Sequence, residues 1–183
     1  MNRIANTRRQ ARGFTLVELC ACVGICAALL GQAVPSMNTL HQEQKLRTSA
    51  QTLADDLHLA RSEAARLSDS VFFRISGKGA NACYVIYIGN RNDCDCTGGK
   101  TVCQSSASHV IKTEWLPASQ PVTLNSNAET LQFQHRLGLV TQTGSIDLSL
   151  KNGTTVRQVV AITGRVRSCY VGSQKVAGMA KCA

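Results

Sequence analysis

The segment that decides the fold is FTLVELCACVGICAALLGQAV, residues 14–34. It is a run of 21 residues with a single formally charged side chain, Glu18. An α-helix rises about 1.5 Å per residue, so this segment spans roughly 30 Å as a helix, which is the thickness of the hydrocarbon core of a bilayer. We therefore predict one membrane-spanning helix over residues 14–34.

The residues ahead of this segment are basic. They include Arg3, Arg8, Arg9 and Arg12 and no acidic residue. By the positive-inside rule this end stays in the cytoplasm, and the chain that follows the helix lies on the other side of the membrane. A secretory signal is cut after its apolar run. Here the sharpest break in character comes before that run, at Gly13-Phe14.

The run Gly13-Phe14-Thr15-Leu16-Val17-Glu18 is similar to the prepilin motif of type IV pilins and type II secretion pseudopilins, and Pro35 falls where such helices often carry a proline. The resemblance implies that residues 1–13 are a leader peptide, that prepilin peptidase cuts between Gly13 and Phe14, and that the new amino group of Phe14 is methylated. It also implies that helix 14–34 anchors the chain in the bacterial inner membrane and then enters the core of a filament of other pilins.

Glu18 has a physical role to fill in such a helix. A carboxylate inside a bilayer is costly and usually finds a partner. In a filament of packed helices, the free amino terminus of a neighbouring subunit provides one. The alternative is a glutamate that only lies near the lipid headgroups.

The sequence after Pro35 indicates an α+β head, residues 69–183, preceded by an amphipathic helix over residues 35–68. Apolar residues at alternating steps of four and three predict a stripe that packs against a sheet in the same subunit. A coiled-coil partner is the less favoured alternative, because the stripe is short and rich in alanine. The stripe consists of Leu46, Ala50, Leu53, Leu57, Ala60, Ala64 and Leu67.

Beyond Asp69 the pattern predicts an antiparallel sheet of short strands. Asn152-Gly153 is a strong hairpin signal between two of them. The predicted strands are 71–76, 83–88, 109–115, 122–124, 130–134, 139–141, 145–150 and 155–163.

Six of the nine cysteines follow the hydrophobic segment, which suggests an oxidising compartment and up to three disulfides. Cys169 and Cys182 flank the C-terminal tail, residues 169–183, and we predict that they pair. Cys83 is expected to pair with Cys94 or Cys96, and Cys103 with the other one, because a bond between Cys94 and Cys96 closes too tight a loop. A zinc site is the alternative, but the spacing lacks the usual paired C-x2-C clamps.

Positive charge is concentrated at the C-terminal end. Residues 14–147 hold 10 basic and 11 acidic residues, whereas residues 148–183 hold six basic residues and no acidic one. Such asymmetry suggests a polyanionic partner. A merely solvated basic face is the alternative.

Two stretches resemble the GspH/FimT family of minor pilins and pseudopilins: residues 47–73, and the C-terminal part that ends in Gly164-Arg165-Val166-Arg167. FimT-type members of that family bind DNA during natural transformation, through this motif and a basic tail. The resemblance therefore implies a DNA-binding surface of Gly164, Arg165, Arg167, Lys175 and Lys181, with Arg157 nearby. Arginines separated by one residue on a strand point to the same side.

Two other functions fit the same resemblance. One is a minor pilin that primes pilus assembly without touching DNA, and the other is a type II secretion pseudopilin similar to GspH. The sequence contains no constellation of catalytic residues, phosphate-binding glycine motif or calcium-loop spacing. We therefore expect a structural and binding subunit that needs no cofactor or metal and is not an enzyme.

Overall fold

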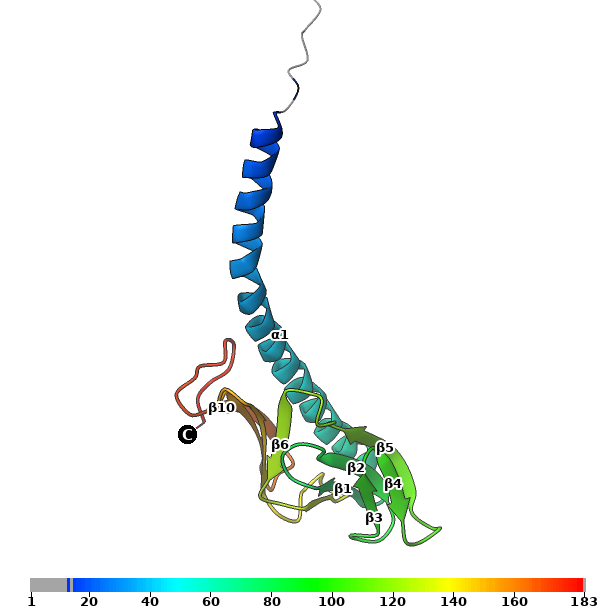
Figure 1. Cartoon of the computed structure of the whole chain (residues 1–183). Coiled ribbons are helices and arrows are strands. Elements are labelled where there is room, and N and C mark those ends of the chain that lie inside the picture. The colour runs from blue at the N-terminus through cyan, green and yellow to red at the C-terminus, as the bar shows by residue number, and fades with distance from the viewer. Residues whose placement is uncertain (1–12, 14, 183) are drawn as a thin grey trace, which may run out of the picture. The chain divides into compact units, whose positions relative to one another are not determined.

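The computed structural model describes residue 13 and residues 15–182, and for residues 30 and 32–36 it describes the backbone alone. Helix α1 runs from Leu16 to Leu67. The chain divides into two compact units, Met1–Leu40 and His41–Ala183, and α1 contributes to both (Figure 1). The two units are described separately. The predicted leader, apart from Gly13, and Phe14 lie outside the described residues.

The first unit is the beginning of α1. Thr15 caps the helix, because its Oγ1 accepts a hydrogen bond from the backbone N–H of Glu18 at 3.3 Å and its carbonyl accepts one from Leu19 at 3.1 Å. Thr and Glu at this spacing match a capping box, and an acid in the first turn also suits the helix dipole.

The large apolar side chains described in the first unit are exposed in the single chain, from Leu16 at 78% to Leu40 at 55%. Within the described residues, no helical stretch combines the length and the apolar character needed to cross a membrane. The single membrane pass stays a prediction.

The second unit is the head, and its strands form two four-stranded antiparallel sheets and a two-stranded ribbon. The first sheet has the order β5-β2-β1-β7, the second the order β10-β9-β8-β6, and the ribbon pairs β3 with β4. This arrangement confirms the predicted α+β class. The strands are β1 Val71–Ser76, β2 Cys83–Ile88, β3 Cys94–Thr97, β4 Lys100–Cys103, β5 His109–Trp115, β6 Val122–Ser126, β7 Thr130–Phe133, β8 Gly144–Leu150, β9 Thr155–Val160 and β10 Val166–Val171.

Several strand predictions need correction. The strand expected over 139–141 is reduced to one isolated bridge between Val140 and Phe133. The strand expected over 155–163 stops at Val160, and the chain turns and starts β10 at Val166. The Gly-Arg-x-Arg motif therefore opens the last strand instead of closing the one before it. β3 and β4 were not predicted.

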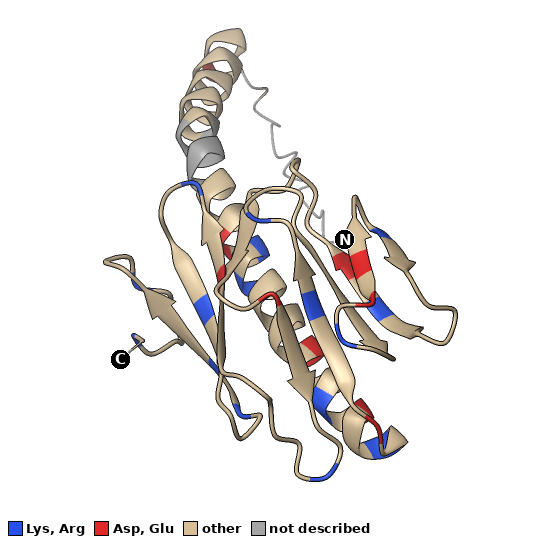
Figure 2. Ribbon diagram, turned by 90° about the horizontal axis from the view of Figure 1, so that it is seen from below, with Lys and Arg blue, Asp and Glu red and all other residues tan. Residues whose placement is uncertain are grey.

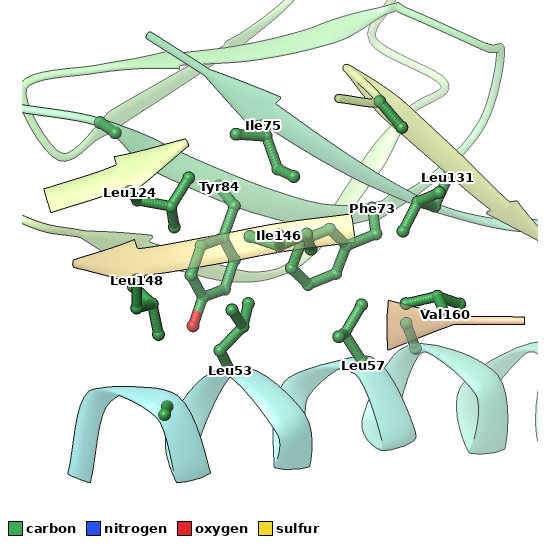
Figure 3. Close-up of a cluster of buried hydrophobic side chains, with 14 of the residues drawn as sticks. Leu53, Leu57, Phe73, Ile75, Tyr84, Leu124, Leu131, Ile146, Leu148 and Val160 are labelled. Carbon is green, nitrogen blue, oxygen red and sulfur yellow. The ribbon is translucent and has the colours of Figure 1, made fainter. Parts of the chain in front are cut away.

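The core of the head lies between α1 and the two sheets, as Figure 3 shows. Leu53 and Leu57 point from the helix toward Phe73 and Tyr84 of the first sheet, whose rings stack with centroids 4.8 Å apart. Burying a side chain of this size stabilises the fold by about 1.5–3 kcal/mol. The predicted helix stripe is confirmed from Leu46 to Ala64, and its last member, Leu67, is 36% exposed at the helix end.

Disulfides fix the two segments that lack a place in the main sheets. Cys83 bonds to Cys96 and Cys94 bonds to Cys103, which ties the ribbon to β2 and its two strands to each other. Cys169 bonds to Cys182 at the end of the chain. The predicted disulfide pattern is confirmed, and the bonds leave none of these cysteines as a thiolate for zinc.

The ribbon buries the outer face of the first sheet. Phe72, Val85 and Tyr87 cluster there with Cys94 and are at most 4% exposed. Asp95 of the ribbon accepts a hydrogen bond from Ser76 Oγ and lies 3.6 Å from a guanidinium nitrogen of Arg74.

Candidate nucleic-acid interface

The register of the second sheet directs a row of cations outward. Val156, Gln158 and Val160 of β9 are buried, so the alternate residues of that strand face away from the core. Arg167 lies opposite Val159 on β10, on this outward face. Arg165 continues the same hairpin, because its carbonyl accepts the N–H of Ala161 at 2.9 Å. Alternation along the strand therefore places Arg165 and Arg167 on one face, and both are exposed.

Gly164 has a structural reason to be glycine. Its φ is +72°, a region that side chains disfavour, and a Cβ there would lie 2.1 Å from the carbonyl oxygen of Gly138. Its N–H donates to the carbonyl of Ala161 at 2.8 Å and closes the turn. The glycine of the motif thus sets the turn from which Arg165 projects.

The C-terminal tail is folded back against β10, to which it returns in Figure 1. The backbone N–H of Tyr170 donates to Ala180, and Cys182 donates to Tyr170, both at 3.0 Å. The tail is also anchored by Val176, which is 5% exposed in the hydrophobic core. Lys181 and Arg167 line one open hollow of about 250 Å³ beside the Cys169–Cys182 disulfide.

Two of the predicted contact residues are engaged elsewhere. Arg157 forms a two-pronged ion pair with Asp147 on the neighbouring strand, with nitrogen–oxygen distances of 2.7 and 2.8 Å. The hydrogen bond to Asp147 raises the pKa of Arg157. Lys175 lines a different hollow, together with Glu43 and Arg47 of α1. The structure therefore brings together Arg165, Arg167 and Lys181. Arg157 lies beside Arg167 on the same face but is paired with Asp147, and Lys175 lines another hollow.

Arg165, Arg167 and Lys181 form a row of cations whose positive charge is not neutralised by a nearby carboxylate among the described residues. In the described part of the chain, no carboxylate lies within 4.0 Å of Arg165, Arg167 or Lys181. β10 and the chain after it carry Lys and Arg but no Asp or Glu, as the ribbon in Figure 2 shows. A guanidinium donates two parallel hydrogen bonds to a phosphate, so this face is chemically suited to a polyanion.

Sequence reasoning missed the neutralising role of Asp147. It also missed a second group of cations, Arg61 and Arg136, which line a hollow at the end of α1. No motif links them in sequence, because 75 positions separate them and the fold alone brings them together.

A helix packed on antiparallel sheets, preceded by a more apolar helical segment, defines a pilin-like protein. A family model described as type II transport protein GspH matches residues 49–164, which is more than half of the chain, and the chain belongs to this family. The matched segment ends at Gly164, so Arg165, Arg167 and the tail lie beyond it.

Among solved structures, the crystal structure of the type IV minor pilin FimU from Pseudomonas aeruginosa resembles the chain with a TM-score of 0.51 and 16% sequence identity. The match covers 68% of this chain and 87% of that one. At 16% sequence identity, this similarity establishes the fold alone. No curated protein matches the chain.

Proposed function

We propose that this chain is a minor pilin that assembles into a type IV pilus and binds DNA, without sequence preference, for uptake in natural transformation. The observation that carries the proposal is the row of Arg165, Arg167 and Lys181 on one exposed face without a carboxylate partner among the described residues. Family membership supports the role of structural subunit, which is not that of an enzyme.

The binding expected at this row is electrostatic. Tyr170 is half-buried and is the sole aromatic residue of β10, so base stacking contributes little. Three phosphate contacts contribute about −2.7 to the slope of log K against log salt on duplex DNA. Disulfide closure of the tail also holds Lys181 near Arg167 before DNA arrives, which lowers the ordering cost of binding.

The test uses residues 41–183, because this unit contains the described strands, the buried core and the three disulfides. The variant Arg165→Gln plus Arg167→Gln should bind duplex DNA more weakly, with a salt slope less steep by about 1.8. The control, Arg91→Gln plus Lys100→Gln, removes the same charge from exposed positions in the loop after β2 and in the ribbon, outside the second sheet. The proposal is contradicted if both variants lose the same amount of DNA affinity, or if the DNA affinity of the wild type does not change with salt.

A second candidate function is that of a type II secretion pseudopilin. The description of the matching family model, a type II transport protein, favours it. Absence of DNA binding by the wild-type head moves the assignment to this function, or to a pilus-priming minor pilin that does not contact DNA.

We also propose how the chain is processed and assembled. Prepilin peptidase removes residues 1–13, and Glu18 then pairs with the amino terminus of a neighbouring Phe14. Glu18 also lies at the capped end of α1, so a substitution must separate its role in the charge pair from its role in the cap. Glu18→Gln does so. It keeps a side chain that suits a capping box and removes the charge. Membrane insertion should persist while filament incorporation falls, and normal incorporation argues against the pairing.

The three disulfides of the head suit an oxidising compartment. This supports a chain that is held in the inner membrane with its head in the periplasm and that then moves to the cell surface as part of a pilus.

A further inference from the structure

A hollow of about 450 Å³ opens beside the last turns of α1, where the loop after β7 crosses the helix. The hollow is more open than enclosed, so a phosphate group can reach its lining from the surface. The ionisable side chains that line it are all potential cations or hydrogen-bond donors, and none is acidic. They are His58, Arg61, His135 and Arg136.

Arg61 is built into the wall of this hollow by two glycines. A Cβ at Gly138 would lie 2.7 Å from Arg61 Nε, and a Cβ at Gly164 would lie 3.1 Å from the same atom. Arg61 Nη1 donates to the carbonyl of Gly164 at 3.4 Å. The side chain is thus held in place by the backbone, and this bond uses one of the five N–H donors of a guanidinium.

The charge of the hollow is not neutralised within the head. No carboxylate lies within 4.0 Å of either Arg61 or Arg136 in the described ranges of the chain. Arg136 is exposed at the loop, and Leu137 beside it is 72% exposed. Two arginines that line one hollow and have open donors are suited to a phosphate group.

The hollow adjoins the row of cations on β10. The carbonyl that holds Arg61 belongs to Gly164, and the next residue is Arg165. The hollow therefore lies at the turn between β9 and β10, and a nucleic-acid strand that follows Lys181, Arg167 and Arg165 comes to this turn.

We propose that the hollow lined by Arg61 and Arg136 is a second phosphate-binding position, which continues the path of the nucleic-acid backbone from the β10 row. This inference rests on the proposed DNA binding. It adds two phosphate contacts to the three made by Arg165, Arg167 and Lys181. The slope of log K against log salt for the intact head therefore becomes about −4.5. An acidic surface of a neighbouring pilin is the competing occupant, and the experiment below separates the two.

The experiment measures the affinity of residues 41–183 for duplex DNA over a series of salt concentrations. Arg136→Gln, at an exposed loop position, should make the salt slope less steep by about 0.9, and Arg61→Gln plus Arg136→Gln by about 1.8. Between about 50 and about 200 mM salt, the fall in affinity of the double variant should be roughly 12-fold smaller than that of the wild type. The charge-matched control Arg91→Gln plus Lys100→Gln should keep the wild-type slope, and a thermal melt of each variant checks the fold.

The outcomes separate the two proposals. If the wild type binds DNA, Arg165→Gln plus Arg167→Gln weakens it and the hollow variants keep the wild-type slope, the hollow is overturned and the proposed function stands. No binding by the wild type overturns both. Lower incorporation into filaments with an unchanged slope assigns the hollow to a protein neighbour. Binding of inorganic phosphate by the wild type with an unchanged DNA slope assigns it to small anions, and either result overturns the inference.

Discussion

Removing Asp147 should strengthen DNA binding, which makes it a sharper test than any loss of function. Asp147 holds Arg157 in a two-pronged ion pair on the outward face of the second sheet. Arg157 lies opposite Cys169 on β10 and is therefore a diagonal neighbour of Arg167. Asp147→Asn keeps the shape of the side chain and removes its charge, so the guanidinium of Arg157 becomes available to a phosphate beside the row.

The magnitude follows from one added contact. The slope of log K against log salt should steepen by about 0.9, so the fall in affinity between about 50 and about 200 mM salt grows roughly 3.5-fold. The fold should tolerate the change. The paired side chains of Arg157 and Asp147 are 35% and 26% exposed, and solvent screening limits such a pair to about 0.2–1 kcal/mol.

The assay is the same salt series with two controls. Asp55→Asn removes an equal charge from an exposed position on α1 and reports the general effect of net charge. Asp147→Asn plus Arg157→Gln removes the released cation and should return the slope to the wild-type value. A slope for Asp147→Asn that matches wild type, or an affinity below that of wild type, shows that Arg157 does not contact a phosphate when Asp147 is removed.

Three further predictions concern the scaffold of the interface. Gly164→Ala should destabilise the head by at least about 1–2 kcal/mol because of its positive φ, and by more because a backbone carbonyl must move; denaturant titration measures this, and an unchanged midpoint contradicts the turn geometry. Replacing Cys169 and Cys182 by serine should cost about 3 kcal/mol of stability in the chain-entropy model and should weaken DNA binding, and an unchanged affinity makes closure of the tail irrelevant. Partial burial disfavours the ionised form of Asp95, but hydrogen bonds from a serine hydroxyl and a backbone N–H, together with a nearby arginine, outweigh it and lower its pKa below the ordinary 3.8. The stabilisation from Asp95 is therefore complete above pH 3.8 and is lost as the pH falls through the lower folded-state pKa, so the unfolding free energies of wild type and Asp95→Asn should converge in acid; a constant difference contradicts this.

The sequence predicts the parts of this head whose pattern is local. The stripe from Leu46 to Ala64 repeats with the helical period, and the structure buries it. Strands β1, β2 and β5 have the predicted bounds because each is a short run of β-branched and aromatic residues between turn residues.

The parts it misses depend on register or on distant contacts. A two-residue turn at Asn152-Gly153 would place Asp147 opposite Gln158. In the structure Leu150 N donates to the carbonyl of Thr154 at 2.9 Å, so the loop is one residue longer and Asp147 lies opposite Arg157. No local signal reveals this shift of one residue, and it decides whether Arg157 is free.

The sequence pattern did not predict the cysteine-rich ribbon or the folded tail, for a different reason. β3 and β4 contain few apolar residues, and the Cys83–Cys96 disulfide holds the ribbon against the first sheet. Val176 and Met179 attach the tail to the core, yet they are the two large apolar residues in a stretch of otherwise polar and small ones. Two apolar residues are too few to establish a periodicity.

The role of Arg165 and Arg167 is measured most directly by DNA uptake in cells whose only copy of the chain carries Arg165→Gln plus Arg167→Gln. We predict that pili assemble at wild-type levels while uptake of DNA falls sharply. Wild-type uptake by these cells, or loss of the pili themselves, contradicts the claim that these arginines bind DNA.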